Sequence, residues 1–436
     1  MPSQITQICQ QARKVSVTLA SLDKESKDRL LRKMAQKVKE QQAEITAANQ
    51  TDLKHAQVLV EAGEMSPVLL SRLALPPHKI DQLVGYLEGV AQLEDPVGRT
   101  QYAMTLDDGL DLIRVTCPLG VLAVLFESRP EVVIQVSALC LKSGNAVILK
   151  GGSEAAQSNR VLFSLINEVL VEEGLEGAVA LIETRQDVAE ILTEEENLDL
   201  IIPRGSNAFV RYIQEHTKIP VLGHSEGICN LYIDGNVDQA MAVGVAIDSK
   251  TDYPSACNAI ENLLFDQACE GPLVEAVLKG LQAVGVRLKA CPVTRDRFPG
   301  LKIEAATEED FHTEYGDLTL SVKTVSGLEE AIEFINKHGS HHTDSILTKD
   351  KHKAELFMTR VDSACVFHNS STRFSDGFVF GLGAEVGIST NKTHARGPVG
   401  LEGLVIYKYL LKGKGQVRAV YSGPKAKRFL HLPLPY

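Results

Sequence analysis

Cys257 has the residue type and the setting of a nucleophile. It stands in a polar segment, residues 251–259, between a helix expected to end near Ser249 and an apolar strand that begins at Ala259. A thiol in a turn at the edge of a sheet can attack a carbonyl carbon, and backbone N–H groups there can hold the oxyanion. The alternative is a loop cysteine without a role. The residues alone favour that alternative, because eight cysteines compete for one role.

Three arginines in turns flanked by glycine or proline are candidates for binding an anion: Arg129, Arg373 and Arg396. A single arginine in such a turn is usually solvated, whereas three in loops of this kind suit a carboxylate or a phosphate. The residues leave both interpretations open.

His338, His341 and His342 form an HxxHH pattern that can suggest a metal site. The pattern follows a predicted helix and lacks the paired cysteine or carboxylate spacing of zinc sites. We therefore expect a hydrogen-bonded polar turn there and no bound metal.

The elements that must position these residues alternate between buried strands and amphipathic helices. Residues 121–126 (VLAVLF) and 146–149 (AVIL) are apolar runs, and each is followed by a polar turn and a segment with helical spacing. Such alternation predicts a parallel sheet covered on both faces. Ligands of these sheets bind at the carboxyl ends of the strands, where the two polar turns lie. The pattern therefore indicates an enzyme that uses a nucleotide cofactor.

Before these units the chain is predicted to be helical for about its first hundred residues, including one long helix from a capping Asp23 to about His55. Asp107-Asp108-Gly109 then separates two strand-like segments, which is a hairpin signal. A hairpin has no obvious place in a parallel sheet, so we expect it to project and pair with another subunit.

After residue 227 a second region alternates strands and helices in the same way. Residues 373–403 then combine seven glycines with charged and aromatic side chains and fit neither helix nor strand. A linker would be small and polar throughout. This composition predicts backbone wrapped tightly around a site.

Length and charge limit the classes of protein that fit. The chain has 436 residues, which predicts two or three domains. A net charge of −11 argues against nucleic acid and anionic membranes as partners, because both require a basic surface. No apolar run approaches the length of a membrane span, and the N-terminus lacks the apolar core of a signal peptide. Scattered cysteines without a CxxC pair make the cytoplasm the simplest compartment.

Several motifs together resemble the γ-glutamyl phosphate reductases, a branch of the aldehyde dehydrogenase superfamily. They span residues 121 to 404 in the expected order: FESRP, ILKGGSEAAQSN, LIIPRGS, GHSEGIC, YPSACNA, HTEYGDL, GSHHTD, VDSACVF, STRFSDG, GLGAEVGIST and HARGPVGLEGL. The resemblance implies an aldehyde-dehydrogenase-like α/β fold with two Rossmann-like domains, parallel sheets and a small β oligomerisation element. The implied domains are an NADPH-binding domain (1–100 and 116–225), a catalytic domain (226–390), and an oligomerisation hairpin with a C-terminal segment (101–115 and 391–436).

By the same resemblance, Cys257 in YPSACNA is the family nucleophile, which reverses the preference stated above. Ser128 takes the position of the usual oxyanion-hole asparagine, and its hydroxyl is a weaker donor. The substrate's carboxylate and phosphate are assigned, without dividing them, to four residues: Arg129, His224, Arg373 and Arg396.

The resemblance also implies a cofactor site. Lys150 is expected to contact the adenosine ribose, and Ser153 replaces the ribose-binding glutamate of NAD-preferring relatives. Loss of that carboxylate removes repulsion against a 2′-phosphate, which favours NADPH. Gly205 and Ser206 open a helix at the pyrophosphate position. Glu314 resembles the glutamate that binds the nicotinamide ribose.

The implied reaction is the NADPH-dependent reduction of L-glutamyl 5-phosphate to L-glutamate 5-semialdehyde, the second step of proline biosynthesis from glutamate. In it the Cys257 thiolate displaces phosphate, and hydride reduces the resulting thioester. A homo-oligomer and a functional coupling to glutamate 5-kinase are expected with it.

Two alternatives belong to other classes. A hydrolytic NAD(P)-dependent aldehyde dehydrogenase of the same fold would carry a water-activating glutamate near residues 221–223, but none stands there and Glu226 is offset. A non-enzymatic scaffold on this fold would have lost its nucleophile, and the presence of Cys257 argues against it.

Overall fold

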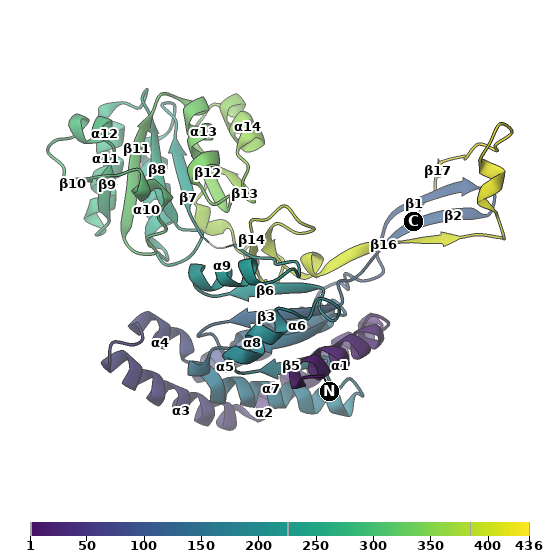
Figure 1. The fold of residues 1–436 in the computed structure, drawn as a ribbon. Helices are drawn as coiled ribbons and strands as arrows, with labels where there is room; N and C mark the ends of the chain where they lie inside the picture. Colours follow the sequence, from purple (N-terminus) through teal and green to yellow (C-terminus); the bar gives the residue numbers. More distant parts are fainter. Residues whose placement is uncertain (1, 225, 384, 436) are drawn as a thin grey trace.

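The computed structural model describes residues 2–224, 226–383 and 385–435. Figure 1 shows two α/β units, one above the other, and a narrow β arm that projects to one side. Ser225 and Ala384, which lie in two of the motifs quoted above, are outside the described residues. The predicted fold class, two units with parallel sheets and a small β element, is confirmed.

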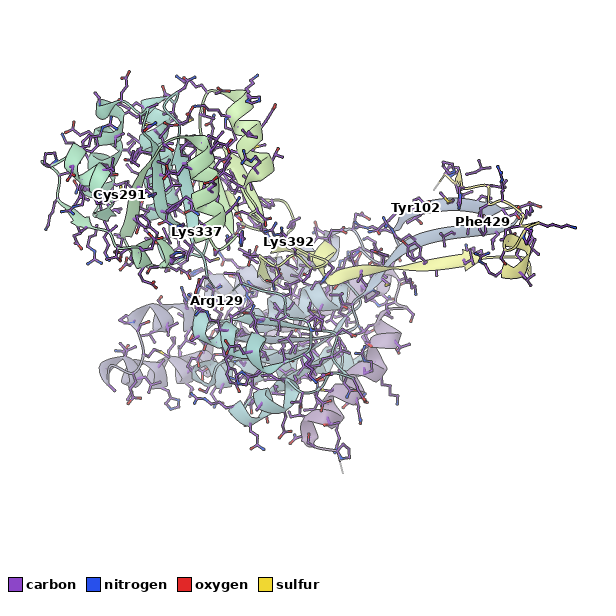
Figure 2. All side chains as sticks on the ribbon, turned by 45° about the horizontal axis from the view of Figure 1, so that its top comes forward. Tyr102, Arg129, Cys291, Lys337, Lys392 and Phe429 are labelled. Atoms are coloured by element: carbon purple, nitrogen blue, oxygen red, sulfur yellow. The ribbon has the colours of Figure 1, made fainter. Side chains whose placement is uncertain are left out.

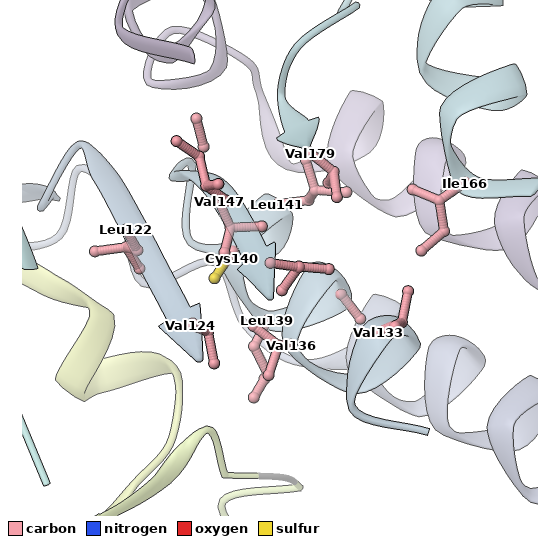
Figure 3. Packing of buried hydrophobic residues seen from close by; sticks show 14 of the residues in the cluster. Leu122, Val124, Val133, Val136, Leu139, Cys140, Leu141, Val147, Ile166 and Val179 are labelled. Carbon is pink, nitrogen blue, oxygen red and sulfur yellow. The ribbon is translucent and has the colours of Figure 1, made fainter. Parts of the chain in front are cut away.

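The first unit is built on a parallel four-stranded sheet with the order β5-β4-β3-β6. Its strands are β3 (Val121–Phe126), β4 (Ala146–Lys150), β5 (Val179–Ile182) and β6 (Leu200–Arg204). Every residue of β3 is buried, as expected for a strand covered on both faces. Figure 3 shows apolar side chains of β3 and β4 beside those of α6 (Val132–Lys142). The runs VLAVLF and AVIL are therefore buried strands, as predicted.

Each of these strands is followed by a helix, and the chain begins with five more. The four that follow strands are α6, α7 (Ala156–Glu172), α8 (Arg185–Ile191) and α9 (Asn207–His216). The first five are α1 (Gln4–Leu19), α2 (Lys24–Glu40), α3 (Gln42–Glu61), α4 (Pro67–Leu73) and α5 (Pro77–Gln92). None of the helices in the described part of the chain is both long and apolar enough to cross a bilayer.

The long helix predicted from Asp23 to His55 is two helices. The cap is confirmed, because the Asp23 side chain accepts a hydrogen bond from the Ser26 N–H at 2.8 Å. The prediction of one continuous helix was wrong, because Gln41, at φ −105° and ψ 25°, separates α2 from α3. Periodicity continued across the break because both helices bury apolar residues; α2 packs mainly on α5 and also on α7, whereas α3 packs mainly on α7 and α4.

The second unit contains a parallel seven-stranded sheet with the order β10-β9-β11-β8-β7-β12-β13. Its strands are β7 (Cys229–Ile233), β8 (Ile260–Asp266), β9 (Arg287–Ala290), β10 (Ile303–Ala305), β11 (Thr319–Val325), β12 (Thr343–Leu347) and β13 (Cys365–His368). Its helices are α10 (Gln239–Thr251), α11 (Gly271–Ala283), α12 (Pro292–Arg297), α13 (Leu328–His338) and α14 (Lys351–Arg360). Sequence patterns missed β9 and β10, because these two strands are short and alternate charged and apolar residues; β10 is an edge of the sheet and β9 lies next to it.

The arm is an antiparallel sheet with the order β16-β2-β1-β17. The predicted hairpin is its centre, β1 (Thr100–Asp107) and β2 (Leu110–Pro118), and the edges are β16 (Val405–Lys412) and β17 (Leu432–Pro433). Figure 2 shows Tyr102 and Phe429 on this arm, far from both α/β units.

Between β13 and the arm, the chain returns to the first unit. The glycine-rich segment forms a small hairpin of β14 (Gly387–Ser389) and β15 (Gly397–Val399). Val386, Val399, Leu401 and Leu404 are buried in the same core as β3 and β4. Residues 386–404 therefore pack on the first unit, where they can contact both units, and the exact domain limits stay a prediction.

Candidate active site

Cys257 lies in the loop between α10 and β8, as its sequence setting predicted, and its side chain is half-buried. Gly227 packs directly against it: a Cβ at position 227 would lie 2.3 Å from the Cys257 carbonyl oxygen. The next residue, Asn258, donates from Nδ2 to the Ser375 carbonyl oxygen at 2.9 Å. The nucleophile loop is thus fixed on one side by the GHSEGIC motif and on the other by the glycine-rich segment.

Two histidines surround the thiol. Sγ of Cys257 and one ring nitrogen from each of His224 and His342 all lie within 4.8 Å of one another. The His224 and His342 rings meet edge to face, with centroids 5.0 Å apart. Nδ1 of His224 also lies 2.9 Å from the carbonyl oxygen of Ile388, which places the glycine-rich segment in this centre.

This arrangement favours a thiolate. Burial alone would raise the pKa of Cys257, but the positive charges of His342 and His224 outweigh burial and hold it well below its usual value. Burial would likewise lower the pKa of His224, but the charge of the Cys257 thiolate, aided by Ile388 and Glu314, raises it to about 9. The pair is therefore a thiolate facing an imidazolium around neutral pH, which is the reactive form of a catalytic cysteine.

The HxxHH pattern does end in a turn, since His341 and His342 both lie in the bend before β12, but the expectation of a merely hydrogen-bonded turn missed that His342 faces the Cys257 thiol. His342 is fully buried, its Nδ1 lies 2.8 Å from the Thr343 hydroxyl, and its Nε2 has no hydrogen-bond partner among the described atoms. His341 does lie in a turn, with Nδ1 2.7 Å from the Asp362 carbonyl oxygen. The GSHHTD motif was the signal that could have identified His342. Spacing along the chain does not show that folding brings His342 beside Cys257, so the pattern alone did not indicate its place in the site.

Two groups of residues have the composition of a metal site. One is the Cys257 centre itself, and the other is Glu308, His312 and His338, whose ligand atoms also lie within 4.8 Å of one another. A soft metal ion at the first group would occupy the thiolate, so metal binding there would inhibit nucleophilic attack. In the second group Glu308 and His312 are exposed side chains at the surface of the second unit.

Arg129 and Arg373 approach the nucleophile loop. Arg129 lies where the two units meet (Figure 2). Burial would raise the pKa of Tyr253, but hydrogen bonds with Ser255 and Arg72 and the charge of Arg72, with a smaller contribution from the charge of Arg129, lower it. Arg373 has its guanidinium 5.9 Å from the Tyr253 ring centroid and donates from Nε to Asp252 at 3.1 Å.

Arg396 is engaged elsewhere. Its guanidinium donates to the Thr390 carbonyl oxygen at 3.1 Å and to the carboxylate and carbonyl oxygens of Asp362 at 3.1 and 3.0 Å. These contacts give it a role in holding the glycine-rich segment. Its predicted role in substrate binding stays a prediction.

The predicted adenosine end of the cofactor site lies at the carboxyl end of β4. Lys150 ends that strand, and Ser153 begins the short helix η1 (Ser153–Ala155). A cavity of about 140 Å³ lies beside them, lined by Gly151, Gly152, Ser153, Ala156, Asn159, Arg160, Leu181, Ile182 and Glu183. Gly151 packs closely against one of the lining side chains, since a Cβ there would lie 2.1 Å from Nδ2 of Asn159.

Ser128, the predicted oxyanion donor, is buried and has a positive φ of 47°. Its N–H and its hydroxyl both donate to Oε1 of Glu154, at 2.6 and 2.8 Å. Both donors are therefore occupied by a carboxylate in this structure. The oxyanion role of Ser128 stays a prediction, and it requires the Glu154 side chain to move.

The N-terminus of α9, the predicted pyrophosphate site, also holds a carboxylate of this chain. Oε2 of Glu127 accepts the Ser206 N–H at 2.9 Å, and it would lie 2.5 Å from a Cβ at Gly205. A carboxylate at this position shows that the helix N-terminus attracts an anion, as its free N–H groups predict.

Glu314, the predicted nicotinamide-ribose ligand, lies between α9 and the nucleophile. Its Oε2 accepts a hydrogen bond from Nδ2 of Asn207, the first residue of α9, at 2.9 Å. Its charge also contributes to the raised pKa of His224. The structure thus places Glu314 at the start of α9 and close enough to His224 of the Cys257 centre for its charge to act there.

No water-activating glutamate stands at residues 221–223, and Glu226 forms an ion pair with Arg211 of α9. Arg211 holds that carboxylate on the helix. The hydrolytic alternative therefore lacks its base at the position where that class carries it.

The chain matches the model of the aldehyde dehydrogenase family over residues 1–292. It is 49% identical to a γ-glutamyl phosphate reductase of Cyanothece sp. over 434 residues, 99% of each protein. It is 47% identical to the γ-glutamyl phosphate reductase of Methanococcoides burtonii over 439 residues, 100% of this chain and 98% of that protein.

Solved structures agree. The crystal structure of γ-glutamyl phosphate reductase from Thermotoga maritima superposes with a TM-score of 0.91 at 37% identity, covering 95% of this chain and 100% of that one. The GapN glyceraldehyde-3-phosphate dehydrogenase of Methanocaldococcus jannaschii, complexed with NADP, shares the fold at 15% identity and a TM-score of 0.66, covering 95% and 96%. This chain belongs to the aldehyde dehydrogenase family and, within it, to the γ-glutamyl phosphate reductases.

Proposed function

We propose that this oxidoreductase reduces L-glutamyl 5-phosphate to L-glutamate 5-semialdehyde with NADPH and releases inorganic phosphate. The observation that carries the proposal is the Cys257 thiol between His224 and His342, whose ring nitrogens lie within 4.8 Å of Sγ. A cysteine held as a thiolate attacks an activated acyl carbon, which is the centre that an acyl phosphate presents.

In the proposed first step Sγ of Cys257 forms a bond to the acyl carbon, and the bond from that carbon to the phosphate oxygen breaks. The electron pair leaves with phosphate, and the protein holds a thioester. The charge of His224 stabilises the thiolate before attack, and His342, whose Nε2 is unpartnered, can donate to oxygen as negative charge develops there. After reduction, the carbon–sulfur bond breaks, the aldehyde leaves and the thiolate is restored.

The residues at the junction fit a nicotinamide cofactor, which supplies hydride when bound. Lys150, Ser153 and the glycines beside them would hold the adenosine ribose, Ser206 the pyrophosphate, and Glu314 the second ribose. The choice of NADPH rests on Ser153 in place of a carboxylate. Arg160 also lines the cavity, but its charge is paired with Glu183 in two contacts of 2.6 and 3.0 Å, so the choice of NADPH does not rest on it.

The thioester must be kept from water until it is reduced. The absence of a carboxylate at residues 221–223 and the ion pair of Glu226 with Arg211 leave no general base there for hydrolysis. The proposal therefore predicts phosphate, and not water, as the acceptor of the acyl group in the reverse direction.

That prediction supplies the test. Purified enzyme is given L-glutamate 5-semialdehyde and NADP⁺, with and without inorganic phosphate, and NADPH formation is followed at saturating cofactor. Turnover is expected only with phosphate. Full turnover without phosphate, together with glutamate as the product, would establish the hydrolytic alternative instead.

We also propose that the arm joins copies of this chain. Its edge strand β16 leaves an unpaired row of backbone groups and exposes large apolar side chains, among them Tyr407 (48%), Tyr409 (56%) and Leu411 (59%). Exposed apolar edge strands of this kind pair with other chains. Light scattering of Leu411→Asp should show smaller particles than wild type, whereas an unchanged mass would contradict this interface.

The remaining proposals concern the cell. All eight cysteines are free thiols, consistent with the reducing cytoplasm that we propose as the compartment. Because an acyl phosphate is labile, we propose functional coupling to a glutamate 5-kinase that produces it.

A further inference from the structure

We propose that Arg72, on helix α4 of the first unit, binds the α-carboxylate of the substrate and so determines which acyl phosphates reach Cys257. The inference rests on the proposed function, because it assigns one end of the proposed substrate. Nothing in the sequence pattern pointed to Arg72, which lies 185 positions before the nucleophile in the helical N-terminal segment.

The placement of Arg72 brings the two units together at the nucleophile loop. α4 packs on the first unit through Leu73, which is buried with Ala56 and Ala155. From there the guanidinium reaches the second unit, with Nη2 3.5 Å from the hydroxyl of Ser255. Ser255 is two residues before Cys257, so a molecule bound at the thiol lies within reach of Arg72.

The guanidinium has unused donors. Within the described residues Arg72 makes no ion pair with a carboxylate, and its Nε is buried without a hydrogen-bond partner. A buried N–H without a partner is unfavourable and marks a place where a ligand completes the hydrogen bonding. The guanidinium contacts the Ser255 hydroxyl at 3.5 Å, at the outer limit of hydrogen-bond length, and hydrogen-bonds the Tyr253 phenol, but Nε stays without a partner and the charge without a carboxylate.

The charges around Arg72 also point to an anion. Arg72 and Arg129 both lower the pKa of Tyr253, against the effect of its burial, so two positive charges act on the same phenol. Arg373 lies over the same ring, but its charge is paired with Asp252 at 3.1 Å. In a chain with a net charge of −11, this concentration of cations at one loop is an anion site.

The geometry of the substrate decides which anion binds there. The phosphate is attached to the carbon that Sγ attacks, so it must lie beside the thiol, among His224 and His342. The α-carboxylate stands at the other end of the five-carbon chain. Arg72 contacts the loop through Ser255 and Tyr253, whereas the two histidines contact it at Sγ, and a planar guanidinium can bind a carboxylate through two parallel hydrogen bonds.

The test uses the reverse reaction with two aldehydes of equal chain length, 5-oxopentanoate, which carries the carboxylate, and pentanal, which lacks it. For Arg72→Ala we expect kcat/KM with 5-oxopentanoate to fall about 10- to 100-fold, the loss typical of a charged hydrogen bond. With pentanal we expect a change of less than about twofold, the range of a side chain that touches nothing in the reaction. Arg72→Lys should recover part of the loss.

Arg32→Ala is the matched control, because Arg32 is an exposed arginine of α2 on the same unit. It should resemble wild type with both aldehydes. An equal loss with both aldehydes in Arg72→Ala, no loss with either, or a raised KM for inorganic phosphate in place of the aldehyde effect would overturn the assignment. These outcomes differ from failure of the proposed function, in which wild-type enzyme itself would show no dependence on phosphate.

Discussion

The polar groups around Cys257 and those in the predicted cofactor loops differ in which residues they contact. Around Cys257, groups of opposite charge face one another: a thiolate meets His224 and His342 within 4.8 Å. At the predicted pyrophosphate site, by contrast, the Ser206 N–H that a ligand needs is already taken by a carboxylate of the chain, Glu127, at 2.9 Å. The reacting atoms are thus arranged in advance, whereas cofactor binding must displace groups already hydrogen-bonded.

Breaking the nucleophile side should have the largest effect. Cys257→Ala removes the atom that forms the thioester, and we expect kcat to fall by about 10⁴-fold or more, as for other nucleophiles. Intact-mass measurement of wild type with substrate and no reductant should show one acyl adduct, and peptide mapping should place it on Cys257. An adduct on another cysteine, or a variant with near wild-type rate, would contradict covalent catalysis by this residue.

His342→Gln should have the next largest effect, with kcat/KM reduced about 10²- to 10³-fold, a range typical of a proton donor or charge at the reacting centre. Loss of its positive charge should also raise the pKa of Cys257. Because a cysteine is reactive above its pKa, the pH at which iodoacetamide alkylation reaches half its maximum should move upward. His352→Gln, at an exposed histidine of α14, is the control and should alkylate as wild type does.

The shifted pKa values of Cys257 and His224 predict how wild-type activity changes at acid and at alkaline pH. The pKa of Cys257 is held low, so activity should persist into mildly acid solution and fall only as pH drops through that pKa. His224 has its pKa raised to about 9, so its positive charge, and the stabilisation it gives the thiolate, should be lost as pH rises past that value. A rate that increased steadily above pH 9 would contradict a role for the charged form of His224.

On the cofactor side, Ser153→Glu should restore repulsion against a 2′-phosphate. We expect kcat/KM for NADPH to fall about 10-fold, with less change for NADH, since Ser153 is exposed and a like charge a few ångströms away near a protein surface costs on the order of 1–2 kcal/mol. Ser153→Ala is the matched variant and should keep its preference. If both variants lose NADPH equally, the hydroxyl itself binds the cofactor and the repulsion argument fails.

The smallest expected effect concerns Glu127 and tests whether its carboxylate competes with the cofactor. Glu127→Gln removes the negative charge that occupies the N-terminus of α9, and we expect NADPH to bind about 2- to 5-fold more tightly, a fraction of one charged hydrogen bond. Fluorescence titration measures the change, and Glu196→Gln, at an exposed glutamate outside the site, is the control. Weaker binding in Glu127→Gln would mean that this carboxylate assists the cofactor.

Local sequence patterns predicted some elements of the fold correctly and missed others. VLAVLF and AVIL read correctly as buried strands because burial on both faces demands an unbroken apolar run. Asp23 was recognised as a cap because capping depends only on neighbouring residues. The break at Gln41 was missed because helix periodicity does not record which partner each turn packs against.

The residues of the candidate active site likewise divide into those that the sequence indicated and those that it did not. Cys257 was recognised through a motif, and its loop between a helix and a strand was visible in the residue pattern. The sequence did not indicate that His342 or Arg72 lies at this site, because neither residue is near Cys257 along the chain. Their proximity comes from the pairing of β12 beside β7 and from the docking of α4 at the junction of the two units.

By itself the amino-acid sequence determined the alternation of strands and helices, the projecting hairpin and the family, because each depends on local pattern or on motifs in order. The tertiary structure decided how the charges meet: it placed two histidines around the thiol, an arginine of the first unit on the loop of the second, and carboxylates on the donors of the predicted pyrophosphate and oxyanion sites. Electrostatic interaction depends on distance through space, and only folding sets that distance between residues far apart in the chain.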